Sequence, residues 1–331
     1  MPKHKRINRR GKRNSIKHKE EIFCIIGVNA NGITSKWNTF KRVVNKTKPL
    51  VWNIKEAKCI VEGGLKLNGY TVFEHVQSSQ DGGRGLAMGC SEKLNPKLTR
   101  SGGDEVEAIT VNINFRKIKI SCTTAYGPQT DDKTEKKDNF WQYLDEEAKK
   151  AELEGEGFLL QGDLNSWLGS DIIQNDPRNL NNNEKRFNTF LTENSLTVVN
   201  ALGICKGLIT RIKMRDGKIQ KSIIDFFVVC KRLRPYLKEM IIDDQKDKIL
   251  TNYNGVNKGK KVAVDTDHMT MLLKMNLNIF PQRSQKIEML DFKYKKGNKF
   301  LKFKELKQMI SQTVLRTYQM CQFRVKIGSK L

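Results

Sequence analysis

Short apolar segments recur along the chain from residue 22 onward, and their lengths suit β-strands better than helices. The segment 107–115 (EAITVNINF) alternates apolar and polar residues with a period of two, and Arg116 and Lys117 follow it as a turn into another apolar segment. This pattern predicts a β-hairpin. The other expected strands are 22–28, 50–54, 85–90, 117–126, 158–162, 196–202, 223–230 and 269–277.

Two segments have apolar residues at helical spacing. In 138–153 (DNFWQYLDEEAKKAEL) the acids come early and the lysines late, which suits the dipole of a helix. The segment 184–196 predicts a second, shorter helix. Strands interleaved with helices, together with one hairpin, predict an α/β fold with mixed β-sheets.

The two ends of the chain differ from its middle. Residues 1–20 are polar and basic without periodicity, which predicts a disordered arm. Residues 281–331 are rich in lysine, with apolar residues three or four apart, which predicts a helical extension. The remaining 21–280 has the length and pattern of one globular domain within the 331 residues.

The net charge of +25 is concentrated in the ends. Residues 1–20 carry nine Lys/Arg and one Glu, and residues 283–331 carry thirteen Lys/Arg and three acids, so that only +7 remains for the middle. Basic arms attract DNA or RNA by neutralising phosphates, and a solvated or nuclear-targeting tail is an equally good interpretation of 1–20 alone.

Cysteine usage and hydropathy indicate an intracellular protein. The seven cysteines are scattered and form no C-x-x-C pair, which predicts reduced thiols and no zinc site. No apolar segment is long enough to cross a membrane, and the N-terminus has no hydrophobic leader. With its basic arm, we expect the protein to be nuclear.

Two polar clusters stand where buried strands should reach the surface. In the motif GDLN (162–165), the alternation of an extended chain directs Asp163 and Asn165 to the same side. An Asx turn, in which both side chains bond their own backbone, is the alternative. The motif DTDH (265–268) brings His268 together with two acids, as a general acid or base requires, although a histidine satisfied within the core is the commoner case.

Asp225 opens a strongly apolar segment, and a buried carboxylate is costly unless it is paired. A histidine that donates a ring N–H to Asp225 would remove this cost and fix its own tautomer. The chain has only four histidines. His268 is the most economical partner, and His75 is the alternative.

Oxygen ligands for a hard cation follow two of the expected strands. Glu56 comes after the strand at 50–54, and Asn29 and Asn31 come after the strand at 22–28. Mg²⁺ prefers such ligands and keeps positions for water and for a phosphate oxygen. Taken separately, the asparagines are ordinary turn residues and Glu56 is a solvent-facing side chain.

The order of these motifs along residues 22–277 resembles that of the endonuclease/exonuclease/phosphatase superfamily. The motifs are Asn29-x-Asn31-Gly, Glu56, Tyr126-Gly-Pro, Gly162-Asp163-x-Asn165, Ser222-x-x-Asp225 and Thr266-Asp267-His268. Within the superfamily, the segments 124–129, 207–229 and 292–306 resemble the apurinic-endonuclease-like domain of non-LTR (LINE-type) retrotransposon polyproteins. The last segment resembles the linker that joins the endonuclease of such polyproteins to a reverse transcriptase. Because no reverse transcriptase follows it in this sequence, we expect an isolated, monomeric endonuclease module.

The resemblance implies a four-layer sandwich, in which two packed sheets have helices outside them. It also implies Mg²⁺, or Mn²⁺ in its place, bound by Glu56 with Asn29 and Asp267 at the metal site. Asn31 stands where related repair enzymes carry Asp, which favours nicking over repair of abasic sites.

The catalytic roles are likewise implied by the resemblance. His268, held by Asp225, would contact or protonate the scissile phosphate, and Asp163 would orient or deprotonate the attacking water. Phosphate oxygens would be held by Asn165 and Tyr126. The positions that contact or line the substrate site would be Asn31, Thr210, Ser222 and Thr266.

The activity implied is that of a Mg²⁺-dependent DNA endonuclease that cleaves a phosphodiester with activated water and leaves a nick with a 3′-hydroxyl. One alternative is a phosphatase or phosphodiesterase of the same fold that acts on small phosphoesters. The other is a catalytically inactive remnant that binds nucleic acid through its basic arms.

Overall fold

The computed structural model describes part of the chain, which divides into two units, residues 1–279 and 280–331. All described residues belong to the first unit, so the arm predicted at 1–20 and the extension predicted at 281–331 lie outside them. No helix among the described residues is long and apolar enough to cross a membrane. The described ranges are 22–58, 63–76, 85–103, 105–170, 172–176, 182–244 and 266–277, with the backbone alone for 254–257 and 260–263.

One mixed sheet has seven strands in the order β10-β14-β17-β1-β2-β4-β3. The pairs β1–β2 and β10–β14 are parallel and the other neighbours are antiparallel. Its strands are β1 (Phe23–Asn29), β2 (Val51–Lys55), β3 (Tyr70–His75), β4 (Leu86–Ser91), β10 (Cys205–Lys206), β14 (Leu237–Ile242) and β17 (Met271–Met275).

The second mixed sheet has six strands in the order β5-β6-β7-β8-β13-β9, of which only β7 and β8 pair in parallel. The predicted hairpin is β6–β7. The strands are β5 (Lys97–Ser101), β6 (Ala108–Phe115), β7 (Ile118–Tyr126), β8 (Gly157–Asp163), β9 (Leu196–Val198) and β13 (Asp225–Cys230). Two separate hairpins are formed by β11 (Arg211–Arg215) with β12 (Lys218–Ser222) and by β15 (Asn254–Asn257) with β16 (Lys260–Ala263).

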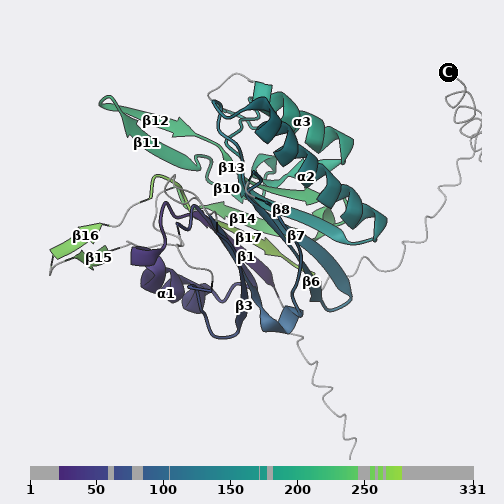
Figure 1. Ribbon diagram of the computed structural model, residues 1–331, viewed down its shortest axis with the longest axis horizontal. Helices are drawn as coiled ribbons and strands as arrows, with labels where there is room; N and C mark the ends of the chain where they lie inside the picture. The colour runs from purple at the N-terminus through teal and green to yellow at the C-terminus, as the bar shows by residue number, and fades with distance from the viewer. Residues whose placement is uncertain are drawn as a thin grey trace, which may run out of the picture. The chain divides into compact units, whose positions relative to one another are not determined.

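Helices cover the outer faces of both sheets, as Figure 1 shows. Leu144 of α2 and Phe187 of α3 are buried in the apolar cluster outside the six-stranded sheet. Phe40 of α1 is buried with Trp52 of β2 on the outer face of the seven-stranded sheet. The α/β sandwich with two mixed sheets and flanking helices is therefore confirmed. The helices are α1 (Trp37–Thr47), α2 (Thr134–Leu153) and α3 (Asn182–Glu193), with 3-10 turns at Thr34–Lys36, Glu92–Leu94, Val199–Ala201 and Arg234–Tyr236.

The strand predicted at 196–202 was wrong beyond Val198, where a 3-10 turn begins. Asn200 explains the change, because its side chain donates to the carbonyl of Asp225 and accepts from the N–H of Phe227, at 3.1 and 3.0 Å. Such side-chain bonds to the backbone compete with the ladder of a sheet. The chain therefore leaves the sheet at this point.

The space between the two sheets changes from apolar to charged along the strands. Because alternate residues of a strand share a face, each strand contributes a series of inward side chains. The apolar members lie in the central core. The series are Phe23-Ile25-Gly27-Asn29 in β1, Val51-Asn53-Lys55 in β2 and Leu159-Gln161-Asp163 in β8. The charged end is the end that carries the predicted site residues.

Gly27 permits the close approach of Gln161 across this interior. A Cβ at Gly27 would lie 2.3 Å from Cδ of the fully buried Gln161 side chain. We expect Gly27→Ala to lower the free energy of unfolding by about 1–3 kcal/mol, the usual cost of overpacking. Urea denaturation would measure the change. Gly203→Ala is the control, because nothing lies within 4 Å of a Cβ there, and an equal effect of both substitutions would contradict the expectation.

Candidate active site

Five polar side chains from distant parts of the chain meet at the charged end of the sandwich. Asn29 ends β1 and Glu56 follows β2, and these parallel strands end at the same edge of their sheet. Asp163 ends β8 and lies opposite Asp225, the first residue of the antiparallel strand β13. His268 precedes β17. The two sheets thus bring together residues that the sequence separates by up to 239 positions.

Asn29 is the centre of the cluster. Its Nδ2 donates to Oε1 of Glu56 at 2.7 Å and to Oδ2 of Asp163 at 2.8 Å, and it lies 3.5 Å from Nε2 of His268. Its Oδ1 accepts from the N–H of Asn31 at 3.1 Å. The fully buried amide therefore presents its donor end, not its carbonyl oxygen, to the two acids.

The expected pairing of His268 with Asp225 is present. Nδ1 of His268 lies 2.8 Å from Oδ2 of Asp225 and 3.6 Å from Oδ2 of Asp163. Both side chains are almost fully buried, at 4% and 1% exposed. The other candidate, His75, bonds instead to Oγ of Ser101 through Nδ1 at 3.0 Å. The Asp225 bond leaves Nε2 of His268 directed toward the cluster.

The charged groups of the cluster lie close together, and the pKa values of Asp163 and His268 are both raised. Burial and the neighbouring charge of Asp225 raise the pKa of Asp163 to about 6. Burial alone would lower the pKa of His268, but the charges of Asp225 and Asp163 outweigh it and raise this pKa to about 9. Near neutral pH, Asp163 is therefore a carboxylate with increased basicity beside a protonated imidazole.

Three site residues adopt left-handed backbone conformations: Asn31, Glu56 and Asn165, with φ of 43°, 47° and 46°. Non-glycine residues adopt this region at a cost, and asparagine does so most readily. Each of the three lies one or two residues after the end of a strand, namely β1, β2 or β8. The bends therefore turn the chain out of the sheet at the edge where the cluster lies.

A metal ion fits the donor set of this cluster. Ligand atoms of Glu56, Asp163 and His268 lie within 4.8 Å of one another. The two carboxylates can ligate as they stand, whereas His268 can do so only when its imidazole is neutral. Carboxylate oxygens suit Mg²⁺ and Mn²⁺, whereas an imidazole suits Mn²⁺ better than Mg²⁺. Of the three metal ligands predicted from the sequence, only Glu56 belongs to this group. Asn29 touches the group through its N–H donors, and Asp267 lies beside it.

Asp267 is held by an arginine that the sequence analysis did not identify. Nε of Arg211 donates to Oδ2 of Asp267 at 2.8 Å, and Oδ1 of Asp267 lies 4.0 Å from Nε2 of His268. Although burial opposes it, the charges of His268 and Arg211 lower the pKa of Asp267. Asp267 is therefore an anion beside the cluster with one oxygen already engaged.

Asn165 and Tyr126 lie next to Asp163. The N–H of Asn165 donates to Oδ1 of Asp163 at 3.2 Å, and its Nδ2 donates to the carbonyl of Gly127 at 2.8 Å. Asp163 thus forms the Asx turn that was the alternative interpretation and also belongs to the cluster, because its other oxygen accepts from Asn29. Burial, with Asp163 and Glu56 nearby, raises the pKa of Tyr126 well above its usual value, so its hydroxyl stays protonated.

Three of the predicted substrate-binding residues hold the backbone of the site. The hydroxyl of the fully buried Thr210 accepts from the N–H groups of Ile224 and Asp225, at 2.9 and 3.1 Å. The carbonyl of Ser222 accepts from the N–H of Thr210 at 3.1 Å. The hydroxyl of Thr266 donates to the carbonyl of Asn29 at 2.8 Å and accepts from the N–H of His268 at 3.3 Å.

Asn31, the fourth, is exposed, and its Oδ1 accepts from Nζ of Lys58 at 2.6 Å. Its backbone N–H is bonded to Asn29, so it lies at the surface next to the cluster. Asp265, from the second polar motif, lies outside the described residues.

The β11–β12 hairpin leaves the body of the domain, as Figure 1 shows. Arg211 at its base forms an isolated β-bridge with His268 of the cluster. This base is joined to the segment before β17, because the N–H of Ile212 donates to the carbonyl of Asp267 and the N–H of Met269 donates to the carbonyl of Thr210, both at 2.7 Å. The hairpin exposes lysines and, at 65% and 62%, the apolar side chains of Met214 and Ile219. Its exposed lysines are Lys213, Lys218 and Lys221.

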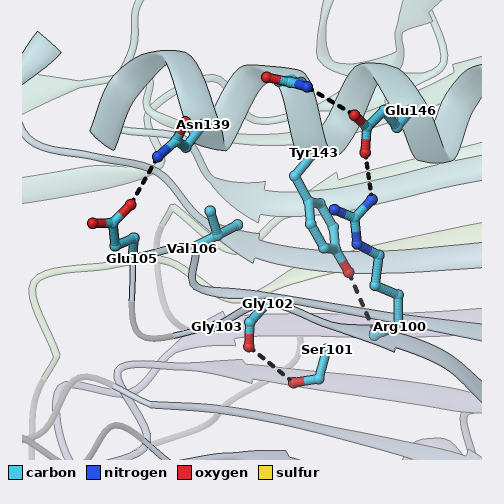
Figure 2. Close-up of a pocket in the computed structure, with 10 residues that line it drawn as sticks. Arg100, Ser101, Gly102, Gly103, Glu105, Val106, Asn139, Tyr143 and Glu146 are labelled. Atoms are coloured by element: carbon cyan, nitrogen blue, oxygen red, sulfur yellow. Dashed lines mark hydrogen bonds and ion pairs between the residues drawn. The ribbon is translucent and has the colours of Figure 1, made fainter. Parts of the chain in front are cut away.

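A separate pocket of about 380 Å³ lies between β5, the loop after it and α2 (Figure 2). Its acidic groups have hydrogen-bond donors: Nη1 of Arg100 donates to Glu146 at 2.7 Å, and Nδ2 of the neutral Asn139 donates to Glu105 at 2.7 Å. The guanidinium of Arg100 also lies over the ring of Tyr143. None of the predicted site residues lines this pocket, so it contributes nothing to the chemistry of the cluster.

The same fold occurs in solved structures of a retrotransposon endonuclease domain, an AP endonuclease and a 3′-5′ exonuclease. The endonuclease domain of TRAS1, a telomere-specific non-LTR retrotransposon, is similar with a TM-score of 0.53 and 16% identity over 77% of this chain and 99% of that one. The AP endonuclease LMAP from Leishmania major gives 0.58 and 15%, over 77% of this chain and 88% of that one.

The 3′-5′ exonuclease NExo from Neisseria meningitidis gives a TM-score of 0.56 and 13% identity, over 76% of this chain and 99% of that one. At these identities the likeness concerns the fold. Neither a protein-family model nor a curated protein sequence matches the chain.

The raised pKa of His268 predicts a stability that depends on pH in the metal-free protein. The pKa is 6.5 for an ordinary histidine and about 9 in the folded state, so the contribution is complete below pH 6.5 and is lost as the pH rises through 9. We expect a loss of at most roughly 3 kcal/mol over this window. Urea denaturation in EDTA at several pH values would measure it.

Two variants test the origin of this slope. His268→Gln removes the titrating group, and Asp225→Asn removes the charge that most strongly raises its pKa. Both should flatten the decrease in stability between pH 6.5 and 9. A slope equal to that of the wild type in both variants would contradict the assignment.

Proposed function

We propose that this protein is a Mg²⁺-dependent DNA endonuclease that hydrolyses one phosphodiester and leaves a nick with a 3′-hydroxyl. The observation that carries the proposal is the single cluster formed by Asn29, Glu56, Asp163, Asp225 and His268 at one end of the sandwich. It contains a carboxylate base, a protonated donor and carboxylate ligands for a cation. Hydrolysis of an anionic ester needs all three.

The residues divide this chemistry between them. Asp163, with its raised pKa, takes a proton from the attacking water as the oxygen bonds to phosphorus. Nε2 of His268, protonated because Asp225 holds Nδ1, donates to a phosphate oxygen. The bond from phosphorus to the 3′-oxygen breaks, the leaving oxygen takes up a proton from solvent water, and Asp163 releases the proton it took to solvent. Mg²⁺ at Glu56 and Asp163 would neutralise charge that develops on the phosphate.

The charge beside the cluster favours DNA over a small phosphoester. The β11–β12 hairpin carries exposed lysines next to the site, and Lys58 bonds Asn31 at the surface next to the cluster. Cations along the approach to a site neutralise several phosphates of a polynucleotide at once, whereas a small ester would engage few of them. The similarity to the TRAS1 endonuclease supports target-site nicking by a retrotransposon, in the nucleus, as the context.

A phosphatase of the same fold is the second candidate. The observation in its favour is that NExo of Neisseria meningitidis is described both as a 3′-5′ exonuclease and as a 3′ phosphatase bound to a DNA hairpin. That activity would use the same cluster on a terminal phosphate. Release of inorganic phosphate without nicking of closed circular DNA would favour it.

Nicking of supercoiled plasmid tests the proposal directly. With Mg²⁺ we expect the wild type to convert supercoiled DNA to the open circle, and EDTA to stop the reaction. Asp163→Asn and His268→Ala should each reduce the rate by about 10²-fold or more, because each removes a proton-transfer or donor group. Lys97→Ala, an exposed lysine on β5, is the control. Equal rates for Asp163→Asn and wild type would exclude the proposal.

The hairpin should contribute affinity without contributing chemistry. We expect Lys213→Gln combined with Lys221→Gln to weaken DNA binding and to reduce the slope of log affinity against log salt by about two, one for each phosphate that the variant no longer neutralises. Fluorescence anisotropy at several salt concentrations would measure it. Because both side chains are exposed and lie outside the cluster, kcat should remain that of the wild type. A salt slope unchanged in the double variant would remove the hairpin from the interface.

A further inference from the structure

Lys55 is a fully buried lysine at the charged end of the sandwich. It ends β2, lies opposite Asn29 in the parallel pair with β1 and directly precedes Glu56. The alternation of β2 places it on the inner face, with Val51 and Asn53, while Trp52 and Ile54 pack on the outer face. Its ammonium group is therefore enclosed between the two sheets, on the same side as the cluster.

The nearest opposite charge to this ammonium is Asp225. Nζ of Lys55 lies 3.8 Å from Oδ1 of Asp225, and among the described residues neither atom has a hydrogen-bond partner. The other oxygen of Asp225 is occupied by Nδ1 of His268. A buried ammonium is costly unless it is paired, and so is a buried carboxylate oxygen without a partner. Each group offsets part of the cost of the other.

The charges of the cluster require such a cation. Asp163 and Asp225 are each only 1% exposed and face one another across paired strands, so their carboxylates repel. His268 supplies one positive charge, between them. Lys55 supplies a second positive charge, next to the oxygen of Asp225 that His268 does not bond. Burial lowers the pKa of Lys55 below its ordinary value, and the charges of Asp225 and Asp163 offset only part of this shift.

We propose that Lys55 is a positioning residue: its buried ammonium is the internal counter-cation that holds Asp225, and through Asp225 holds His268, in the arrangement that cleaves a phosphodiester. This inference rests on the function proposed above. Lys55 has no exposed surface, so it acts on the reaction through Asp225 and makes no contact with DNA. Its removal should therefore change kcat and leave KM for DNA unchanged, whereas loss of a hairpin lysine should do the reverse.

The test uses Lys55→Met, which keeps the length of the side chain and removes its charge, with Lys97→Met on β5 as the matched control. The first measurement is the downfield proton resonance of the His268 Nδ1–H bond in metal-free protein, assigned by its absence in His268→Gln. We expect this resonance to shift or vanish in Lys55→Met and to persist in Lys97→Met. On plasmid DNA, kcat should fall roughly ten- to hundredfold, as for other misplaced groups.

If Lys55→Met folds poorly, a double-mutant cycle measured by urea denaturation, here called the stability cycle, still tests the inference. Removing one partner of a buried ion pair is more damaging than removing both. We therefore expect Lys55→Met to lower the urea midpoint strongly, and the double variant Lys55→Met/Asp225→Asn to recover much of this loss. Strictly additive effects of the two substitutions would overturn the inference, because contacting groups couple.

The outcomes separate the two proposals. An unchanged resonance together with an unchanged kcat in Lys55→Met would refute the role of Lys55 while leaving the endonuclease standing. If the wild type failed to nick DNA, the proposed function would fall. The resonance and the stability cycle, which use neither metal nor DNA, would then still decide whether Lys55 holds Asp225.

Discussion

The hydrogen bond between Asp225 and His268 is the interaction on which the rest of the candidate site depends. It joins the first residue of a strand in one sheet to a residue just before a strand of the other sheet. An ionised carboxylate could not remain buried there without a donor and a counter-charge. The same bond occupies Nδ1 of the imidazole, so Nε2 is the nitrogen left to face the cluster. One contact thus links residues of the two sheets and sets the orientation of the His268 ring.

The surroundings of this bond follow from the alternation of the strands. Each inward series is apolar at one end of the sandwich and polar at the other, where β2 and β8 end in the charged Lys55 and Asp163 and β1 ends in Asn29. The apolar part supplies the burial that stabilises the packed sheets. The charged part is buried next to this apolar core, where the dielectric constant is low. The electrostatic interactions among Asp163, Asp225 and His268 are therefore stronger than they would be in water. Stability and reactivity therefore come from successive residues of the same strands.

The sequence predicted this site better than it predicted the elements around it. Asp163, Asp225 and His268 were identifiable because a charged residue beside an apolar segment must be paired or functional. Lys55 gave the same signal, since period two places it inside with Val51, and it was overlooked beside the more familiar Glu56. Arg211 gave no local signal, because its partner Asp267 is 56 residues away. Helix α1 was missed because WNTFKRVVNKT has low helical propensity, which packing against the sheet overrides.

The scaffold also joins the basic β11–β12 hairpin to the polar cluster. Backbone bonds connect the base of the β11–β12 hairpin to Asp267 and Met269, on either side of His268. Thr210, at the same base, bonds the N–H of Asp225. Both members of the Asp225–His268 pair are therefore anchored to the hairpin by short hydrogen bonds. The basic hairpin proposed to bind a long polyanion and the pair proposed to align its phosphate are thus connected by hydrogen bonds of one network.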